Sequence, residues 1–166
     1  MTLLDQGFAD QLIEALASGR ASIMPLVNAV VGALPGIHVI TWIAVAADGS
    51  RTVRIGTSDP ARFPVGGFDL VTENDPWCRR ILADKQAVIC NSIAAMFDML
   101  PDEAQSLVDM GFGATASVPI VIEGRTVGTL NLLADAGALS AATMAEVTAL
   151  IPVAALVHPH TVKTNS

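Results

Sequence analysis

Basic residues are few in this sequence, and they do not cluster. The 166 residues include nine Lys and Arg against sixteen Asp and Glu, which gives a formal net charge of -7 and an isoelectric point near 4.7. Binding to the phosphates of a nucleic acid needs clustered positive charge. The sequence therefore predicts no nucleic-acid partner.

Cysteine is also scarce, with only Cys78 and Cys90 in the whole chain. In a cytosolic protein two cysteines are reduced thiols by default, and they do not form a disulfide framework. The sequence contains no C-x-x-C motif, no P-loop and no G-x-S-x-G motif. His38, His158 and His160 lack partners at metal-ligand spacing. We therefore predict no metal site and find no assembled catalytic motif.

A membrane-spanning segment is missing as well. No uninterrupted apolar run approaches the roughly 20 residues that a membrane helix needs, and the start MTLLDQGFADQ has acids where a signal peptide has basic residues. We therefore expect a cytoplasmic protein with no membrane partner. Yet 52% of the residues are hydrophobic and the mean hydropathy is +0.54. One monomer would not hide this much apolar surface, which predicts an oligomer.

The most informative stretch is 114–133, ATASVPIVIEGRTVGTLNLL, where two β-rich runs flank a Glu-Gly pair. This pattern predicts an antiparallel hairpin. A two-residue turn would mix polar and apolar residues on both faces. A three-residue loop from Ile122 to Gly124, closed by a G1 bulge, instead places Thr115 opposite Asn131 and Ser117 opposite Thr129. All polar side chains then share one face, which either meets water or lines a pocket.

The opposite face of this hairpin would be apolar and would need a cover of helices. Its residues are Ala116, Val118, Ile120, Gly128, Leu130 and Leu132. Two amphipathic segments near the N-terminus are suitable covers. They are predicted as helices over about 3–18, with the stripe Leu4, Phe8, Leu12 and Leu16, and from near Ser22 to Leu34.

The residues SVPIVIEGRTVGTLNLL, with the Phe-Gly before them and the Ser140-capped helix after them, resemble the end of a GAF domain. This family comprises small cytosolic sensor modules. The resemblance implies an α+β, PAS-related fold with a central antiparallel sheet, usually of six strands. Terminal helices would pack on one face, and a ligand pocket with shorter helices would lie on the other. We expect residues 1–166 to form one free-standing GAF-like domain, with a flexible tail over about 158–166.

The remaining elements follow from local signals. Strands are predicted over 37–46, 51–57, around Phe68 and over 87–90. Asp75 and Pro76 begin a helix that runs to about Asp84, and shorter helices are expected around Met96 and after Pro101. Pro152 should kink or break the last helix. Trp42 is interpreted as a core residue, although both faces of its strand are apolar and its side is therefore open.

Our leading functional hypothesis is a non-enzymatic small-molecule sensor of GAF type. The expected pocket residues are Phe68, Trp77, Cys78, Phe112, Thr115, Ser117, Thr129 and Asn131. The resemblance does not name the ligand or a cofactor. Bilin-binding relatives attach their chromophore through a Cys followed by His, but here Arg79 follows Cys78 and Asn91 follows Cys90. The extended signature of cyclic-nucleotide-binding GAF domains is also missing.

Two alternatives remain open. One is a dimerisation module with a vestigial pocket, paired through the terminal helices and the stripe Val147, Leu150, Ile151 and Ala154. The other is a thiol-dependent reductase, resembling the GAF-fold enzymes that act on free methionine sulfoxide, with Cys78 and Cys90 as its catalytic residues. At the start of a helix the thiol pKa of Cys78 should be lowered. A return strand over 87–90 would bring Cys90 back towards it.

Overall fold

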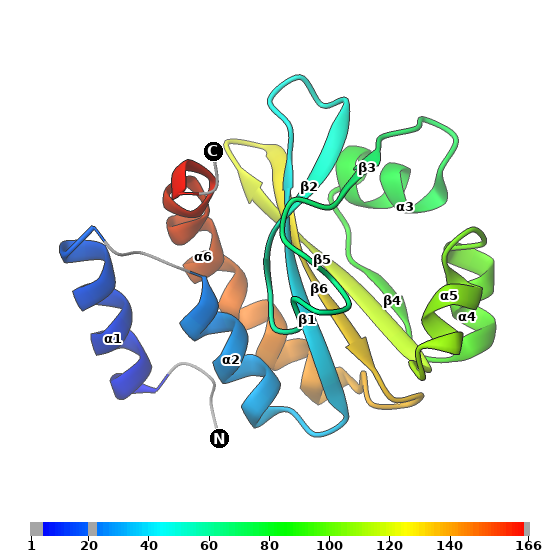
Figure 1. Cartoon of the computed structure of the whole chain (residues 1–166), viewed down its shortest axis with the longest axis horizontal. Coiled ribbons are helices and arrows are strands. Elements are labelled where there is room, and N and C mark those ends of the chain that lie inside the picture. The colour runs from blue at the N-terminus through cyan, green and yellow to red at the C-terminus, as the bar shows by residue number, and fades with distance from the viewer. Residues whose placement is uncertain (1–4, 20–22, 165–166) are drawn as a thin grey trace.

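The structure is a computed structural model that describes residues 5–19 and 23–164, with side chains up to Pro159. Its centre is a six-stranded antiparallel sheet (Figure 1). The strand order across the sheet is β3-β2-β1-β6-β5-β4. The strands are β1 (Ile37–Val45), β2 (Arg51–Thr57), β3 (Phe68–Leu70), β4 (Val88–Cys90), β5 (Ala114–Ile122) and β6 (Arg125–Ala134). The predicted α+β class and the predicted sheet are confirmed.

Helices cover the two faces of this sheet unequally. Figure 1 shows α1 (Gln6–Ala17), α2 (Met24–Ala33) and α6 (Ala141–Thr164) on one side. The shorter helices lie on the other side and are α3 (Pro76–Cys78) with its π-helical continuation η1 (Arg79–Ala83), α4 (Ile93–Met99) and α5 (Ala104–Asp109). The predicted helix starts at residue 3 and near Ser22 lie outside the described residues. Asp5 caps α1 by accepting from the Phe8 backbone N–H at 2.8 Å.

The main core lies between the sheet and helices α2 and α6. Leu130 and Leu132 from β6 are fully buried there, as are Val30 from α2 and Leu150 from α6. Trp42 is buried in the same cluster. This confirms its interpretation as a core residue and places it on the helix-covered face.

The hairpin β5–β6 has the predicted faces but not the predicted register. Ser117 pairs with Asn131, and Thr115 pairs with Leu133. The loop has two residues, Glu123 with φ 51° and Gly124 with φ 75°, as in a type I′ turn. The three-residue loop and its pairings were therefore wrong.

The prediction of which hairpin residues share each face is nevertheless confirmed, because the strand pairing shifts by one residue between Ile120 and Val121. This β-bulge leaves Val127 as an extra residue on β6 and restores the alternation beyond it. Polar residues thus share one face, as predicted, and Ala116 pairs with Leu132 on the apolar face. A bulge in the strand replaces the bulge that was expected in the loop.

Helix α6 differs from its prediction at two places. It continues through Pro152 and Pro159 to Thr164, so Pro152 does not break it and residues 158–164 belong to the helix. Burial explains the difference, because each large apolar side chain removed from water contributes about 1.5–3 kcal/mol, enough for several of them to offset a proline. Val147, Leu150 and Val157 are buried on both sides of Pro152. His158 is buried too, at 5% exposure.

Helix α6 is apolar enough to resemble a membrane-spanning helix. Its segment Ala141–Pro159, 19 residues long, is long and apolar enough to cross a membrane by length and composition. No such run was expected from the sequence. The core helix of a soluble protein passes the same test, and in this fold the apolar stripe of α6 packs on the sheet.

Candidate functional site

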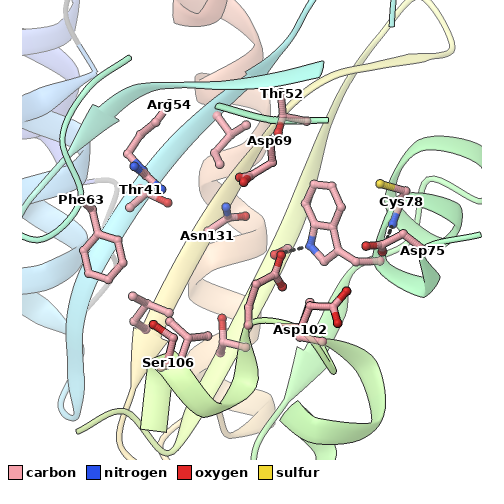
Figure 2. A pocket seen from close by; sticks show the side chains of 18 of the residues that line it. Thr41, Thr52, Arg54, Phe63, Asp69, Asp75, Cys78, Asp102, Ser106 and Asn131 are labelled. Atoms are coloured by element: carbon pink, nitrogen blue, oxygen red, sulfur yellow. Dashed lines mark hydrogen bonds between the residues drawn. The ribbon is translucent and has the colours of Figure 1, made fainter. Parts of the chain in front are cut away.

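A cavity of about 370 Å³ lies on the sheet face opposite α2 and α6. The floor comes from β1, β2, β5 and β6, and the walls come from β3, the start of α3 and the residues around α5 (Figure 2). Its volume is at the small end of the roughly 300–1,000 Å³ that small-molecule sites occupy. The cavity therefore fits a small ligand.

Polar side chains form a row across the floor. Thr41 on β1 pairs with Asn131 on β6, and Asn131 pairs with Ser117 on β5. Directly paired residues point to the same face, so all three side chains meet the cavity. The Oδ1 atom of Asn131 is buried without a hydrogen-bond partner. A buried acceptor without a partner is costly, which makes this floor suited to a ligand that donates hydrogen bonds.

The wall above β5 is fixed by the beginning of α3. Asp75 caps this helix, as predicted, by accepting from the Cys78 backbone N–H at 3.0 Å. Trp77 follows, and its Nε1–H donates to Ser117 Oγ at 2.8 Å. The indole is therefore held against the polar row of the floor. The cap and this hydrogen bond together position an aromatic surface over the cavity.

The charges around the cavity are mostly negative. Asp69, Asp75, Asp102 and Glu103 line it, together with Arg54. Desolvation raises the pKa of the Glu103 carboxyl, and the nearby Asp75, Asp69 and Asp102 raise it further. These four acids come from three separate segments of the chain. The fold thus gathers negative charge that the sequence distributes over 35 positions, from Asp69 to Glu103.

Arg54 is held at the opposite side of the cavity. Its Nη1 donates to the Pro64 carbonyl at 3.1 Å, and its guanidinium lies 5.5 Å from the centre of the Phe63 ring. Desolvation lowers the pKa of this arginine, and the charge of Asp69 acts in the opposite direction. The Nε atom of Arg54 is buried without a hydrogen-bond partner.

Comparison with known proteins agrees with this architecture. The family model described as "GAF domain" matches residues 23–157. The chain belongs to the GAF domain family. No curated protein sequence matches it.

Solved structures resemble this GAF domain at low sequence identity. The GAF domain of an Acinetobacter phosphoenolpyruvate-protein phosphotransferase is 14% identical, covers 95% of each chain and has a TM-score of 0.66. Residues 122–287 of a methyl-accepting chemotaxis protein are 11% identical, with a TM-score of 0.69 over 94% of this chain and 98% of that one.

An enzyme is also among these neighbours. The type II free methionine-R-sulfoxide reductase of Thermoplasma acidophilum is 11% identical, with a TM-score of 0.60 over 89% of this chain and 94% of that one. Because all three identities are low, these neighbours show the fold of the GAF domain and not its chemistry.

Five of the eight expected pocket residues line the cavity of this GAF domain: Trp77, Cys78, Thr115, Ser117 and Asn131. Phe68, Phe112 and Thr129 do not. Phe68 is 59% exposed, with Arg51 over its ring. Phe112 packs in a small cluster with Val39, Phe63 and Leu133. Thr129 is fully buried two residues from Asn131 along β6, outside the lining.

Several lining residues had not been predicted. Thr41, Thr52 and Arg54 reach the cavity because β1 and β2 present them on the polar face of the sheet. A bulge at Ile55 turns Ile55 into the core and keeps Arg54 beside Ile43. The alternation of Thr52 and Arg54 with apolar residues in β2 was the sequence signal that would have predicted these two lining residues. Asp69 lies in the short strand β3, and Asp102 and Glu103 lie just before α5, so no local pattern indicated a common site for these acids.

The cysteines do not have the environment that thiol chemistry requires. Burial raises the pKa of the Cys78 thiol, and Asp75, Glu103 and Asp69 raise it further, while a hydrogen bond to the Thr72 backbone opposes them. The predicted lowering by a helix N-terminus was wrong, because α3 has only three residues before its π-turn and acids surround the thiol. Burial likewise raises the pKa of Cys90, which packs with Ile81, Val88 and Met96.

Proposed function

We propose that this GAF domain is a non-enzymatic sensor or regulatory module that binds a small molecule. The observation that carries the proposal is the cavity of about 370 Å³ over the polar face of the sheet. It combines a floor of hydroxyl and amide groups with an aromatic wall at Trp77. Ligand sites combine apolar and aromatic walls with polar groups at defined positions, and this cavity has both.

The comparisons support the sensor class. GAF domains are typically sensor or regulatory units, and one structural neighbour is part of a methyl-accepting chemotaxis protein. Binding in such a module acts by shifting the population between two conformations, and the ligand needs a different affinity for each. The segments that contribute Asp69, Asp102 and Glu103 are the natural moving parts, because they are exposed and lie outside the main core.

Native mass spectrometry of the purified protein tests this proposal. We expect a mass increment below about 500 Da, since the cavity is at the small end of the ligand-site range. The substitution Asn131→Leu, which places an apolar side chain in the polar row, should abolish the increment. Gln105→Leu on the exposed surface of α5 should leave it unchanged. Wild-type protein that retains no small molecule, and gains none from a metabolite extract, would contradict ligand binding.

The reductase alternative is not favoured by the site. Nucleophilic attack requires a thiolate. Both thiols are buried, at 7% exposure for Cys78 and 2% for Cys90, and both have a raised pKa. The structural likeness to a methionine sulfoxide reductase extends to the fold alone.

A cytoplasmic homodimer completes the proposal. The high apolar fraction supports self-association. The stripe of α6 that was expected to pair is buried against the sheet, at 0% exposure for Val147, Leu150 and Ala154. A dimer through the terminal helices would use their outer surfaces instead, where Ile13 is 63% and Leu156 is 67% exposed. If the protein dimerises but binds nothing, the dimerisation module with a vestigial pocket becomes the better reading.

A further inference from the structure

The cavity carries an excess of negative charge that nothing in the described part of the chain neutralises. Four carboxyls face a single guanidinium, that of Arg54. Figure 2 shows Asp69, Asp75 and Asp102 around the cavity, on separate segments. None of the four carboxyls has an ion-pair partner within the residues that the structure describes. Like charges repel one another, so a cavity lined by these carboxyls favours a positively charged ligand.

The floor adds hydrogen-bonding groups that lack partners. Thr41 and Thr52 line the cavity at 5% exposure each. Neither hydroxyl has a hydrogen-bond partner among residues 5–19 and 23–159. The Oδ1 atom of Asn131 is likewise buried and unpaired. These atoms are acceptors or can act as acceptors, whereas an ammonium group has three donors and no acceptor.

A metal ion does not fit this arrangement. No group of three or more His, Cys, Asp or Glu in the described residues is placed to hold one. The carboxyls are therefore spread around a space, and do not converge on a point. The space also has apolar walls, formed by Leu100, Leu107, Leu133 and the Trp77 indole. An indole face attracts cations, and the leucines suit a hydrocarbon.

We propose that the ligand of this cavity is a small organic cation, an amine or amidine with a short hydrocarbon body. The inference rests on the proposed function and names the chemical class of the molecule that the site would sense. The cationic group lies among Asp69, Asp102 and Glu103, and the hydrocarbon part lies against Trp77 and the leucines. Anionic molecules such as phosphates and nucleotides are repelled by the same carboxyls.

Arg54 suggests an alternative class of ligand, a zwitterion. Its buried, unpaired Nε would suit a carboxylate, so a zwitterion with charges at both ends would use both sides of the cavity. Arg54 already donates from Nη1 to the Pro64 carbonyl, and its guanidinium lies 5.5 Å from the centre of the Phe63 ring. Its charge also interacts with Asp69, so this arginine serves as a partial counter-charge to that carboxyl. We therefore place the simple cation ahead of the zwitterion.

A matched probe panel tests the class. The 166-residue protein is titrated by calorimetry with 2-phenylethylamine, 2-phenylethanol, 3-phenylpropanoate and phenylalanine, and with the corresponding butyl series without a ring. We expect the amine to bind best in each series, by about tenfold or more over the alcohol, because the carboxylates interact with the charged form. Its affinity should fall as salt rises, since screening weakens attraction at an open site.

Two pairs of variants locate the effect. The double variant Asp102→Asn and Glu103→Gln should weaken amine binding about tenfold or more by removing two charges from the wall. Glu103 makes no side-chain capping bond to α5, so folding is not at stake there. The control, Asp98→Asn with Glu123→Gln, removes the same net charge at exposed positions outside the lining and should bind like wild type. Arg54→Gln should tighten amine binding, because it removes the positive charge that faces the carboxyls of the lining.

The outcomes separate the inference from the proposed function. Alcohol or carboxylate probes that bind better than the amine would overturn the cationic class and leave the sensor proposal intact. Phenylalanine that binds tenfold better than the amine, with the gain lost in Arg54→Gln, would replace the cation by a zwitterion. No binding by any probe, together with no retained molecule in native mass spectrometry, would overturn both.

Discussion

The two cysteines show how strongly a side chain depends on its surroundings. A raised pKa means that less of each thiol is ionised at pH 7 than in an ordinary cysteine. We therefore expect both to react slowly with a thiol reagent in the native protein and rapidly after denaturation. The single variants Cys78→Ser and Cys90→Ser show which thiol is responsible for each part of the labelling reaction. Fast native labelling of Cys78 at pH 7 would revive the reductase interpretation.

His158 is the residue that sequence reasoning misplaced most. The Trp42 Nε1–H donates to its Nδ1 at 2.9 Å, beneath the sheet and far from the cavity. An imidazole that accepts at Nδ1 is neutral there. Burial lowers the pKa of His158, although a hydrogen bond with the Val127 backbone acts against this. Protonation would place a charge in the core and remove the acceptor for Trp42.

This contact predicts a pH dependence of stability. Because the folded-state pKa lies below the unfolded value of about 6.5, the unfolded chain takes up the proton first. Stability is complete above pH 6.5 and decreases as the pH falls towards the folded pKa. His158→Gln should cost about 1–3 kcal/mol at pH 7.5, through the lost hydrogen bond, and should flatten the profile below about pH 6.5.

Thermal unfolding across this range measures both effects. The control is Gln86→Ala, at an exposed position without a titratable group. That variant should keep the slope of the wild-type profile. An unchanged slope in His158→Gln would mean that other groups produce the pH dependence.

At the scale of elements, the β5–β6 turn is the most testable feature. Glu123 and Gly124 both have positive φ, a conformation that costs most residues about 1–2 kcal/mol. Gly124→Ala should therefore lower the unfolding free energy by about 1 kcal/mol. Glu123→Asn should raise it by roughly 0.5 kcal/mol, because Asn-Gly is the preferred pair in a type I′ turn. Chemical denaturation measures both changes.

A charge control accompanies these two variants. Glu123→Gln removes the carboxylate and keeps the backbone preference, so it should change stability little. If Glu123→Asn destabilises the protein as much as Gly124→Ala, the turn is not of this type. That result would instead support the three-residue loop that was predicted from the sequence.

At the scale of the whole molecule, the prediction concerns self-association. Sedimentation at micromolar concentration should show a two-fold dimer, because the terminal helices carry exposed apolar residues on their outer side. Leu156→Glu should shift the protein towards monomer, since a charge at an apolar contact is costly. Val65→Glu, in the loop before β3 and 49% exposed, should not. A clean wild-type monomer would contradict the dimer.

The local pattern of the sequence was sufficient for element types, the faces of the hairpin and the fold class. Alternation along 114–133 has a period of two, so polar and apolar residues separate whichever partner each one meets. Capping residues such as Asp75 and Ser140 act within one turn and were equally readable. Five pocket residues followed from these two kinds of signal.

Only the tertiary structure decided the features that depend on segments far apart in the chain. The bulge at Val127 set the register, and burial on the sheet carried α6 through Pro152 and brought His158 to Trp42. Asp69, Asp75 and Glu103 became neighbours because β3, the start of α3 and the start of α5 meet at one cavity. Burial raises the pKa of Cys78 and these acids raise it further, where the helix alone would lower it. Burial and charge act through space, so no short window of sequence contains them.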